Sequence, residues 1–160
     1  MDENRRRFWR VPPPWERWVG CVDVVQMNEQ EGALLADESL DGDGATRQFA
    51  EKVLTLGPST LMLTRNERGS QTFYRNSAGD LQVESYAPVP AGEPQDETGC
   101  GDTFLMGFTW AFLQSNKRDI ACQFANRVAG INVCLRGIDG ISQIGQFLKP
   151  EERELGLADD

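Results

Sequence analysis

Two short apolar segments constrain the fold more than any other feature of this sequence. They are residues 21–27 (CVDVVQM) and 60–64 (TLMLT). Both are rich in aliphatic and β-branched residues, which predicts short strands that are covered on both faces. Helical patterns over residues 28–36 and 45–56 separate them, and the second places Phe49, Val53 and Leu54 on its inner side. The order strand, helix, helix, strand predicts a right-handed crossover in a parallel sheet, and therefore an α/β fold.

The remaining pattern predicts a hairpin followed by helices. Residues 71–75 and 81–86 flank the turn-forming run 76–80 (NSAGD), so we expect antiparallel strands at the edge of the sheet. Helices are predicted over residues 102–114, 118–136 and 143–154, with a short one at 15–19. The helix over 102–114 is apolar nearly all round, which predicts a central, buried position. One side of this helix carries an aromatic stripe of the kind typical of a hydrophobic core. The stripe consists of Phe104, Phe108 and Phe112, and Leu105 and Leu113 lie beside it.

Length and composition indicate one domain of a globular protein. The 160 residues divide into an N-terminal arm and proline-rich loop (1–20), an α/β core (21–150) and an acidic tail (151–160). The net charge of −9 argues against broad affinity for nucleic acid or anionic lipid. No secretory segment and no long apolar run is present, so we expect neither export nor a membrane span, and a cytoplasmic location.

The sequence lacks the side chains of several common active sites. It contains no His, which excludes nucleophiles activated by a His of this chain and most zinc chemistry. The four cysteines (Cys21, Cys100, Cys122 and Cys134) form no Cys-x-x-Cys pair, so reduced thiols are expected. Cys100 is therefore interpreted as a small packing residue and not as a nucleophile.

The segment from Asp96 to Phe104 (DETGCGDTF) predicts an anion site. Its glycines, Gly99 and Gly101, let the backbone approach a ligand closely just before a helix, where amides without intrahelical partners and the helix dipole favour negative charge. Asp102, in the first helical turn, is placed to take a proton from a hydroxyl while the amides hold a phosphoryl group. The alternative is an ordinary helix cap, because Asp and Gly are common there.

This segment, followed by Gly107 and Phe108, resembles the C-terminal signature of the ribokinase-like (PfkB) sugar kinases. The family usually has Asp-Thr-Thr-Gly-Ala-Gly-Asp-Thr-Phe; here Glu97 replaces a Thr and Cys100 replaces an Ala. The resemblance implies that Gly99, Cys100 and Gly101 form the anion hole and that Asp102 is the catalytic base.

A second pair of residues resembles the family at the end of the first predicted strand. Asn28 and Glu31 match its Asn-x-x-Glu, which organises magnesium, water and phosphate. The spacing equally fits a capping box, in which the two residues satisfy the start of a helix, and both interpretations can hold together. The resemblance implies that Asn28 contacts the nucleotide phosphates and that Glu31 binds Mg²⁺ through water.

Two further matches imply contacts with the nucleotide. Thr64 and Gly69 fit the family's Thr-x-Gly-x-x-Gly, although Asn66 replaces a glycine; Asn tolerates left-handed backbone angles. The alternative for this segment is an ordinary lead into a hairpin. Asn126 lies about 200° around its helix from the inward Phe124, so core packing does not explain it. It resembles the family Asn beside the adenine, and the alternative is a plain exposed Asn.

The two ends of the chain carry weaker resemblances. Asp2, Asn4, Arg6 and Trp9 resemble an Asp-x-Asn-x-Arg pattern that follows a central strand, although a phosphate-binding tail or a solvated terminus would also account for four arginines there. Residues 137–144 resemble a loop that binds a monovalent cation. That resemblance implies K⁺ near Asp96, Thr98 and Gly137.

Together these matches imply an ATP-dependent phosphotransferase of the ribokinase or fructokinase type, acting on a sugar hydroxyl with Mg²⁺. The implied fold is a three-layer αβα domain with a mostly parallel sheet and an antiparallel edge hairpin. Family members are longer, so we expect the N-terminal strands, the lid and most sugar contacts to be missing here. The alternatives are a truncated product, a subunit completed by another chain, or an inactive nucleotide-binding or regulatory module. A homo-oligomer or a complementing N-terminal half is the expected partner.

Overall fold

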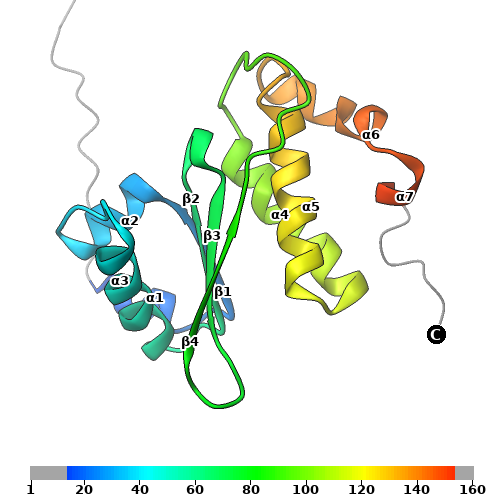
Figure 1. Cartoon of the computed structure of the whole chain (residues 1–160). Helices are drawn as coiled ribbons and strands as arrows, with labels where there is room; N and C mark the ends of the chain where they lie inside the picture. The colour runs from blue at the N-terminus through cyan, green and yellow to red at the C-terminus, as the bar shows by residue number, and fades with distance from the viewer. Residues whose placement is uncertain (1–13, 154–160) are drawn as a thin grey trace, which may run out of the picture.

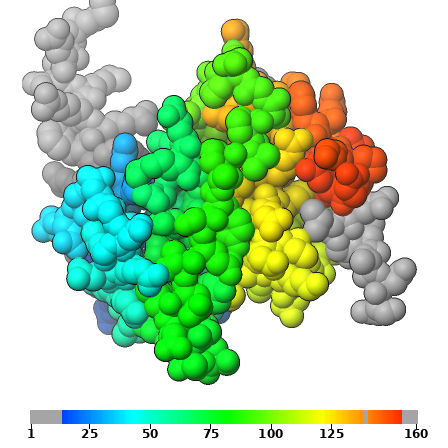
Figure 2. Space-filling model, viewed as in Figure 1, coloured from blue at the N-terminus to red at the C-terminus, as the bar shows by residue number. Residues whose placement is uncertain are grey.

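A four-stranded mixed sheet forms the centre of the computed structural model, which describes residues 14–153 (Figure 1). Its strands are β1 (Val24–Asn28), β2 (Thr60–Thr64), β3 (Ser70–Arg75) and β4 (Leu81–Tyr86), in the order β1-β2-β3-β4. β1 and β2 are parallel, and β3 and β4 form the predicted antiparallel hairpin. The turn of that hairpin projects beyond the helices (Figure 2).

The expectation of a mostly parallel sheet is wrong for the described residues. β2 and β3 are also antiparallel, so the sheet has one parallel and two antiparallel pairings. The reason lies in the connection after β2, which is only the short 3₁₀ turn η1 (Asn66–Arg68). A parallel neighbour would need a crossover of a dozen or more residues, whereas a turn of this length can only reverse the chain.

Helices cover both faces of the sheet, which confirms the three-layer arrangement (Figure 1). On one face lie α1 (Trp15–Val19), α2 (Glu29–Ala36) and α3 (Asp43–Thr55), with the predicted Phe49, Val53 and Leu54 of α3 all buried. On the other face lie α4 (Cys100–Ser115) and α5 (Arg118–Asn132). Two hydrophobic cores result, one on each side of the sheet.

β2 belongs to both cores. Leu61 and Leu63 are fully buried against the α1–α3 layer, while Met62 is fully buried against α4 and α5. This alternation follows from the strand geometry, in which successive side chains point to opposite faces. The prediction of a strand covered on both sides is therefore confirmed for β2.

Polar contacts also join α5 to the sheet. The amide group of Asn126 donates a hydrogen bond to the Ser70 hydroxyl at 2.9 Å, and the Thr72 hydroxyl lies 3.2 Å from the Cys122 thiol. All four residues are buried, so each contact satisfies groups that could not reach water.

The C-terminal region differs from the predicted long helices. α5 ends at Asn132, four residues before Arg136, because the amides of Cys134 and Leu135 bond carbonyls three residues back and not four. Beyond this point the carbonyl of Val133 accepts hydrogen bonds from the amides of Gln95 and Asp96 at 2.7 and 3.1 Å. In place of one helix over 143–154 there are three short elements: η2 (Ile138–Gln143), α6 (Ile144–Phe147) and α7 (Pro150–Arg153). Pro150 explains the break between α6 and α7, since proline disfavours helical angles in the residue before it.

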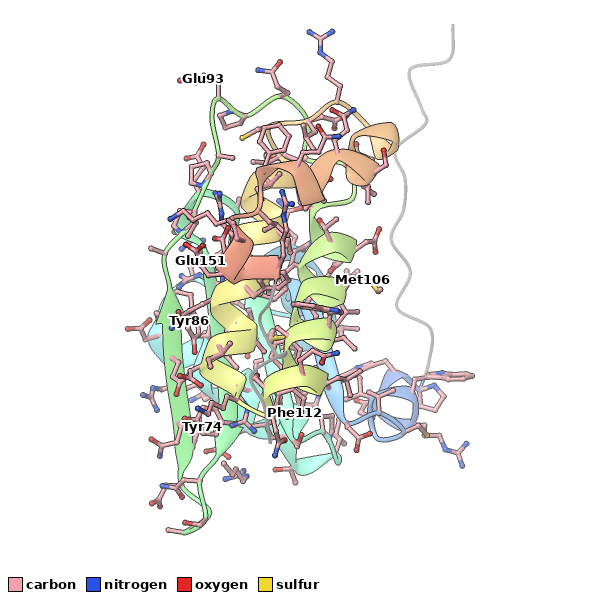
Figure 3. The ribbon with its side chains drawn as sticks, turned by 90° about the vertical axis from the view of Figure 1, so that its right-hand side faces the viewer. Tyr74, Tyr86, Glu93, Met106, Phe112 and Glu151 are labelled. Atoms are coloured by element: carbon pink, nitrogen blue, oxygen red, sulfur yellow. The ribbon has the colours of Figure 1, made fainter. Side chains whose placement is uncertain are left out.

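α4 is not buried all round, contrary to the expectation from its sequence. Phe104 and Phe108 face the core, but Leu105, Met106 and Leu113 are 36%, 68% and 76% exposed. Met106 lies on the side of α4 that is turned away from α5 and from Tyr86 (Figure 3). Among the described residues nothing packs over this side, which we call the outer α4 face (Leu105, Met106 and Leu113).

No described helix is long and apolar enough to cross a bilayer.

Gly69 illustrates how tightly the hairpin packs. Its φ is 78°, and a Cβ atom at this position would lie 1.9 Å from the carbonyl oxygen of Tyr86. We expect Gly69→Ala to lower the free energy of unfolding by about 2–5 kcal/mol, from left-handed strain and overpacking together. Gly79→Ala is the matched control: its φ is 88° but open space surrounds it, so only about 1–2 kcal/mol of strain is expected. Urea denaturation measures both, and equal losses would contradict the packing argument.

The outer α4 face predicts self-association of the isolated chain, because an exposed apolar patch is an interface or an aggregation hazard. Replacing Met106 and Leu113 by Lys together should shift light scattering towards the monomer. Leu34→Lys, which removes a similarly exposed apolar side chain from α2, should leave the scattering unchanged. A wild-type chain that is monomeric at all concentrations tested would contradict the prediction.

Candidate functional site

A pocket of about 480 Å³ lies where β1 and β2 end. Because the two strands are parallel and Asn28 pairs with Thr64, their carboxyl ends meet at the same edge of the sheet, where α/β proteins bind ligands. The pocket is lined by the start of α2, by the turn after β2 and by one residue of the loop before α4: Asn28, Glu29, Gln30, Thr64, Arg65, Asn66, Glu67, Arg68 and Glu97. Segments far apart in the sequence therefore form one site.

Asn28 and Glu31 form a complete capping box at the start of α2. The Asn28 side chain accepts a hydrogen bond from the Glu31 amide, and the Glu31 carboxylate accepts one from the Asn28 amide, both at 2.8 Å. The structural interpretation of this pair is thus confirmed. A role with phosphate or Mg²⁺ stays a prediction, and of the two only Asn28 lines the pocket.

The segment before α4 has the geometry of an anion site. Gly99 is the N-cap with a φ of 80°, and Cys100 begins the helix. The Cys100 amide donates to the Glu97 carbonyl at 3.1 Å, so it is already paired. The amides of Gly101 and Asp102 have no hydrogen-bond partner among the described residues. They, and not the Cys100 amide, are the donors that this helix start presents to a ligand.

Gly101 has room around it. A Cβ atom there would meet only the Gln26 side-chain amide, at 3.8–4.0 Å, which is an ordinary contact. Glycine inside a helix lowers stability by about 0.5–1 kcal/mol relative to alanine. Packing of the described chain does not require a glycine at this position. The lack of a side chain instead leaves space for a ligand to approach the unpaired amides of Gly101 and Asp102.

Gln26 connects this helix start to the pocket. Its amide donates to the Thr64 hydroxyl at 3.4 Å, and the same amide group lies beside Gly101. Sequence reasoning missed this residue. The pattern that could have found it is a long polar side chain inside a strand that otherwise packs apolar residues.

Asp102 is exposed, with no hydrogen bond or ion pair to another described residue, and it does not line the pocket. It lies in the first turn of α4, next to the unpaired amides. Its carboxylate is therefore open to a ligand that those amides bind.

Two arginines were also missed. Arg65 and Arg68 both form ion pairs with Glu29: Arg65 Nε lies 3.0 Å from one carboxylate oxygen, and Arg68 bonds the other. The partners are 36 and 39 residues apart in the sequence, so no local sequence pattern predicts these ion pairs. Asn66, between the arginines, has a φ of 50°, which agrees with the expectation that Asn replaces a glycine there.

Asp96, Thr98 and Gly137 lie together, whereas a monovalent cation bound near them stays a prediction. The Asp96 carboxylate accepts hydrogen bonds from the Thr98 amide at 2.9 Å and the Gly137 amide at 3.0 Å. Hydrogen bonds from the hydroxyl and amide of Thr98, and then from Gly137, hold the pKa of Asp96 below its usual value. Asn132, which sequence reasoning missed, donates to the Thr98 carbonyl at 3.0 Å, and its own buried Oδ1 has no partner among the described residues.

Cys100 is held within this region as a thiol. Its sulfur accepts a hydrogen bond from the Asn132 amide at 3.3 Å, and burial raises the pKa of the Cys100 thiol. A thiol that stays protonated is a poor nucleophile, which fits the packing role expected from the sequence.

Asn126 is neither exposed nor dispensable for packing, which corrects the helical-angle argument. Its amide nitrogen donates to the Ser70 hydroxyl at 2.9 Å and to the Cys122 carbonyl at 2.8 Å. The reason is that α5 packs against both α4 and the sheet, so a side chain about 200° around the helix from Phe124 is also buried. A contact with adenine stays a prediction. Packing also explains the glycine at position 69, because a Cβ atom there would clash with the Tyr86 carbonyl, and Gly69 does not line the pocket.

Comparisons with known proteins agree with this arrangement. A family model described as pfkB family carbohydrate kinase matches residues 4–143. The ribokinase of Bacillus subtilis is 34% identical over 128 residues, which cover 80% of this chain and 39% of that protein. The bifunctional protein HldE of Salmonella arizonae is 27% identical over 130 residues, covering 81% and 26%.

Solved structures show the same fold. The Arabidopsis thaliana ribokinase in complex with ribose and ATP matches with a TM-score of 0.72 at 22% identity, over 84% of this chain and 43% of that one. A putative ribokinase II of E. coli in complex with ATP and Mg²⁺ matches with a TM-score of 0.61 at 23% identity, over 83% and 41%. The chain thus spans less than half the length of these relatives. Since the family model covers most of this sequence, the chain belongs to the pfkB family of carbohydrate kinases.

Proposed function

We propose that this chain forms the nucleotide-binding and phosphoryl-transfer part of an ATP-dependent kinase that acts on a sugar hydroxyl. The observation that carries the proposal is the meeting of three segments at one sheet edge: the end of β1, the end of β2 and the loop that leads into α4. Gln26 extends this site to the unpaired amides at the start of α4. An anion held there would lie beside Asp102.

The proposed roles follow from this layout. The amides of Gly101 and Asp102, in the turn that Gly99 permits, would hold the transferred phosphoryl group. Asp102 would take the proton from the attacking hydroxyl. Asn28 and Thr64 would contact the phosphate chain, since both line the pocket. Gly69 and Asn126 would act on the nucleotide by shaping the strands and helix beside it, and Cys100 would fix the turn.

The residues present fit Mg²⁺ that is carried mainly by the substrate. In the described part of the chain, no three acidic or thiol side chains gather in the way needed to cage a metal ion. Glu31 would hold hydrated Mg²⁺ through water, which suits an ion that keeps much of its hydration and binds phosphate oxygens. When bound, Mg²⁺ would neutralise charge on the phosphates.

A monovalent cation such as K⁺ also fits the residues present. Thr98 links the two side chains, since its amide donates to the Asp96 carboxylate and its carbonyl accepts from the amide nitrogen of Asn132. The buried Oδ1 of Asn132 has no hydrogen-bond partner among the described residues. A buried oxygen without a hydrogen-bond donor is an unfavourable arrangement that a cation would relieve. We propose that such a cation would stabilise the turn between Asp96 and Gly99 together with the loop at Gly137.

The outer α4 face favours a working unit that is larger than the described residues. Two of its exposed apolar side chains, Leu105 and Met106, lie within the first two turns of the helix, next to the site-bearing end. We propose that sugar binding and full activity require a further segment or a second chain that covers this face. A nucleotide-binding module without activity is the form expected in its absence.

The nucleotide site predicts weak binding of Mg-ATP by the chain itself. Gly101→Asp should abolish this binding, because it places bulk and negative charge beside the unpaired amides. Gly145→Asp adds the same group at an exposed site in open space and should bind as the wild type does. Titration calorimetry measures all three, and a folded wild type that gives no heat would remove the support for a nucleotide site.

If Asp102 is the catalytic base, its replacement should slow the phosphoryl-transfer step without weakening the binding of ATP. In an enzyme completed by the remaining kinase segments, Asp102→Asn should lower kcat by about 10²–10⁴-fold, the usual contribution of a positioned base. The affinity for ATP should change little, because Asn keeps the shape of the side chain. Asp119→Asn is the matched control, since Asp119 lies in the first turn of α5 and is also exposed. Phosphorylation of sugar by the Asp102 variant at the wild-type rate would refute the role.

A further inference from the structure

We infer that Arg68 contacts the phosphate chain of the bound nucleoside triphosphate, and that Glu29 holds its guanidinium when no nucleotide is present. The inference rests on the proposed function, because it assigns a further residue to the same pocket. It starts from the charges on the pocket walls, which comprise two guanidiniums and three carboxylates: Arg65, Arg68, Glu29, Glu67 and Glu97. A ligand with several negative charges needs a cation here that can be released to it.

The two arginines differ in how firmly they are held. The Arg65 side chain is 13% exposed and bonds Glu29 through Nε, so this pair is largely removed from water. The Arg68 side chain is 54% exposed. An exposed ion pair contributes little to stability, so Arg68 can leave Glu29 at small cost, whereas an unpaired Arg65 would be an almost buried charge.

Glu29 does not need both partners. If Arg68 turned away, Arg65 would still neutralise the Glu29 carboxylate through the 3.0 Å contact. The released guanidinium has a planar set of donors that matches phosphate oxygens, and such charge-assisted hydrogen bonds are among the stronger ones in proteins.

The position of Arg68 is fixed from both sides along the chain. It ends η1, where its amide donates to the Arg65 carbonyl at 3.0 Å, and Gly69 follows against the Tyr86 carbonyl. Arg68 thus extends from a rigid turn at the end of β2, on the same wall as Thr64. A long side chain on a fixed turn can reach a ligand without movement of the backbone.

The test compares affinities for Mg-ATP and for adenosine, which lacks phosphate, by titration calorimetry of the whole chain. Arg68→Gln should raise the Kd for Mg-ATP by about tenfold, as expected when a charge-assisted hydrogen bond is lost. Its Kd for adenosine should not change. Arg75→Gln is the matched control, because Arg75 forms a similar pair with Glu51 at the far end of β3, outside the pocket; both affinities should equal those of the wild type.

Glu29→Gln separates a phosphate contact from a purely structural ion pair. It removes the carboxylate from Arg68 and leaves that guanidinium free, while the Gln side-chain oxygen can still accept a hydrogen bond from Arg65 Nε. Binding of Mg-ATP should therefore be equal to or tighter than that of the wild type. If the pair only stabilises the turn, Glu29→Gln should weaken binding as much as Arg68→Gln does. Should Arg68→Gln fail to fold, Arg68→Lys keeps the charge but loses the planar donor set, and a partial loss confined to Mg-ATP is expected.

The outcomes distinguish the inference from the function on which it rests. Wild-type binding of Mg-ATP that is unaffected by Arg68→Gln, or equally weakened by Glu29→Gln, overturns the inference and leaves the nucleotide site in place. A folded wild type that binds neither Mg-ATP nor adenosine overturns the proposed nucleotide site, and the role of Arg68 with it.

Discussion

The burial of β2 on both faces is the constraint on which the rest of this structure depends. Leu61 and Leu63 require an apolar layer on one side, and Met62 requires one on the other. The crossover through α2 and α3 supplies the first layer, and α4 and α5 supply the second (Figure 1). Because a crossover returns β2 parallel to β1, both strands end at the same edge. The site forms there as a consequence of how the core is covered.

Several residues at this edge serve the fold as well as the proposed chemistry. Asn28 and Glu31 cap α2, Gly69 allows two strands to approach, and Asn126 satisfies Ser70. A substitution at such a position changes stability and ligand binding together. Gly101 and Asp102 differ from them, since the described chain uses neither the space at the first nor the carboxylate of the second. These two positions report most directly on function.

The sequence predicted features that depend on neighbours close along the chain. The strand at 60–64, the inner side of α3, the capping box and the left-handed Asn66 all follow from local patterns. What could not be predicted depends on contacts between distant segments. Glu29 meets Arg65 and Arg68 only because β1 and β2 end together, and Asn132 reaches Thr98 only after α5 has packed. The outer α4 face was expected to be buried because its side chains are apolar. Apolar side chains indicate that a surface is to be covered, but they do not identify the segment or chain that covers it.

The buried polar contacts between β3 and α5 also determine where the helix can sit. Hydrophobic contacts are non-directional, so an apolar helix could slide along the sheet by one turn and still bury its surface. Cys122 and Asn126 are four residues apart, about 6 Å along a helix, while their partners Thr72 and Ser70 are two residues apart, about 6.6 Å along a strand. The two spacings agree, so both contacts form only in one register. Sliding by one turn would break at least one of these contacts and leave a buried hydroxyl of β3 without its partner on α5. Since α5 packs against α4, the register of α5 on the sheet also determines the position of the first amides of α4.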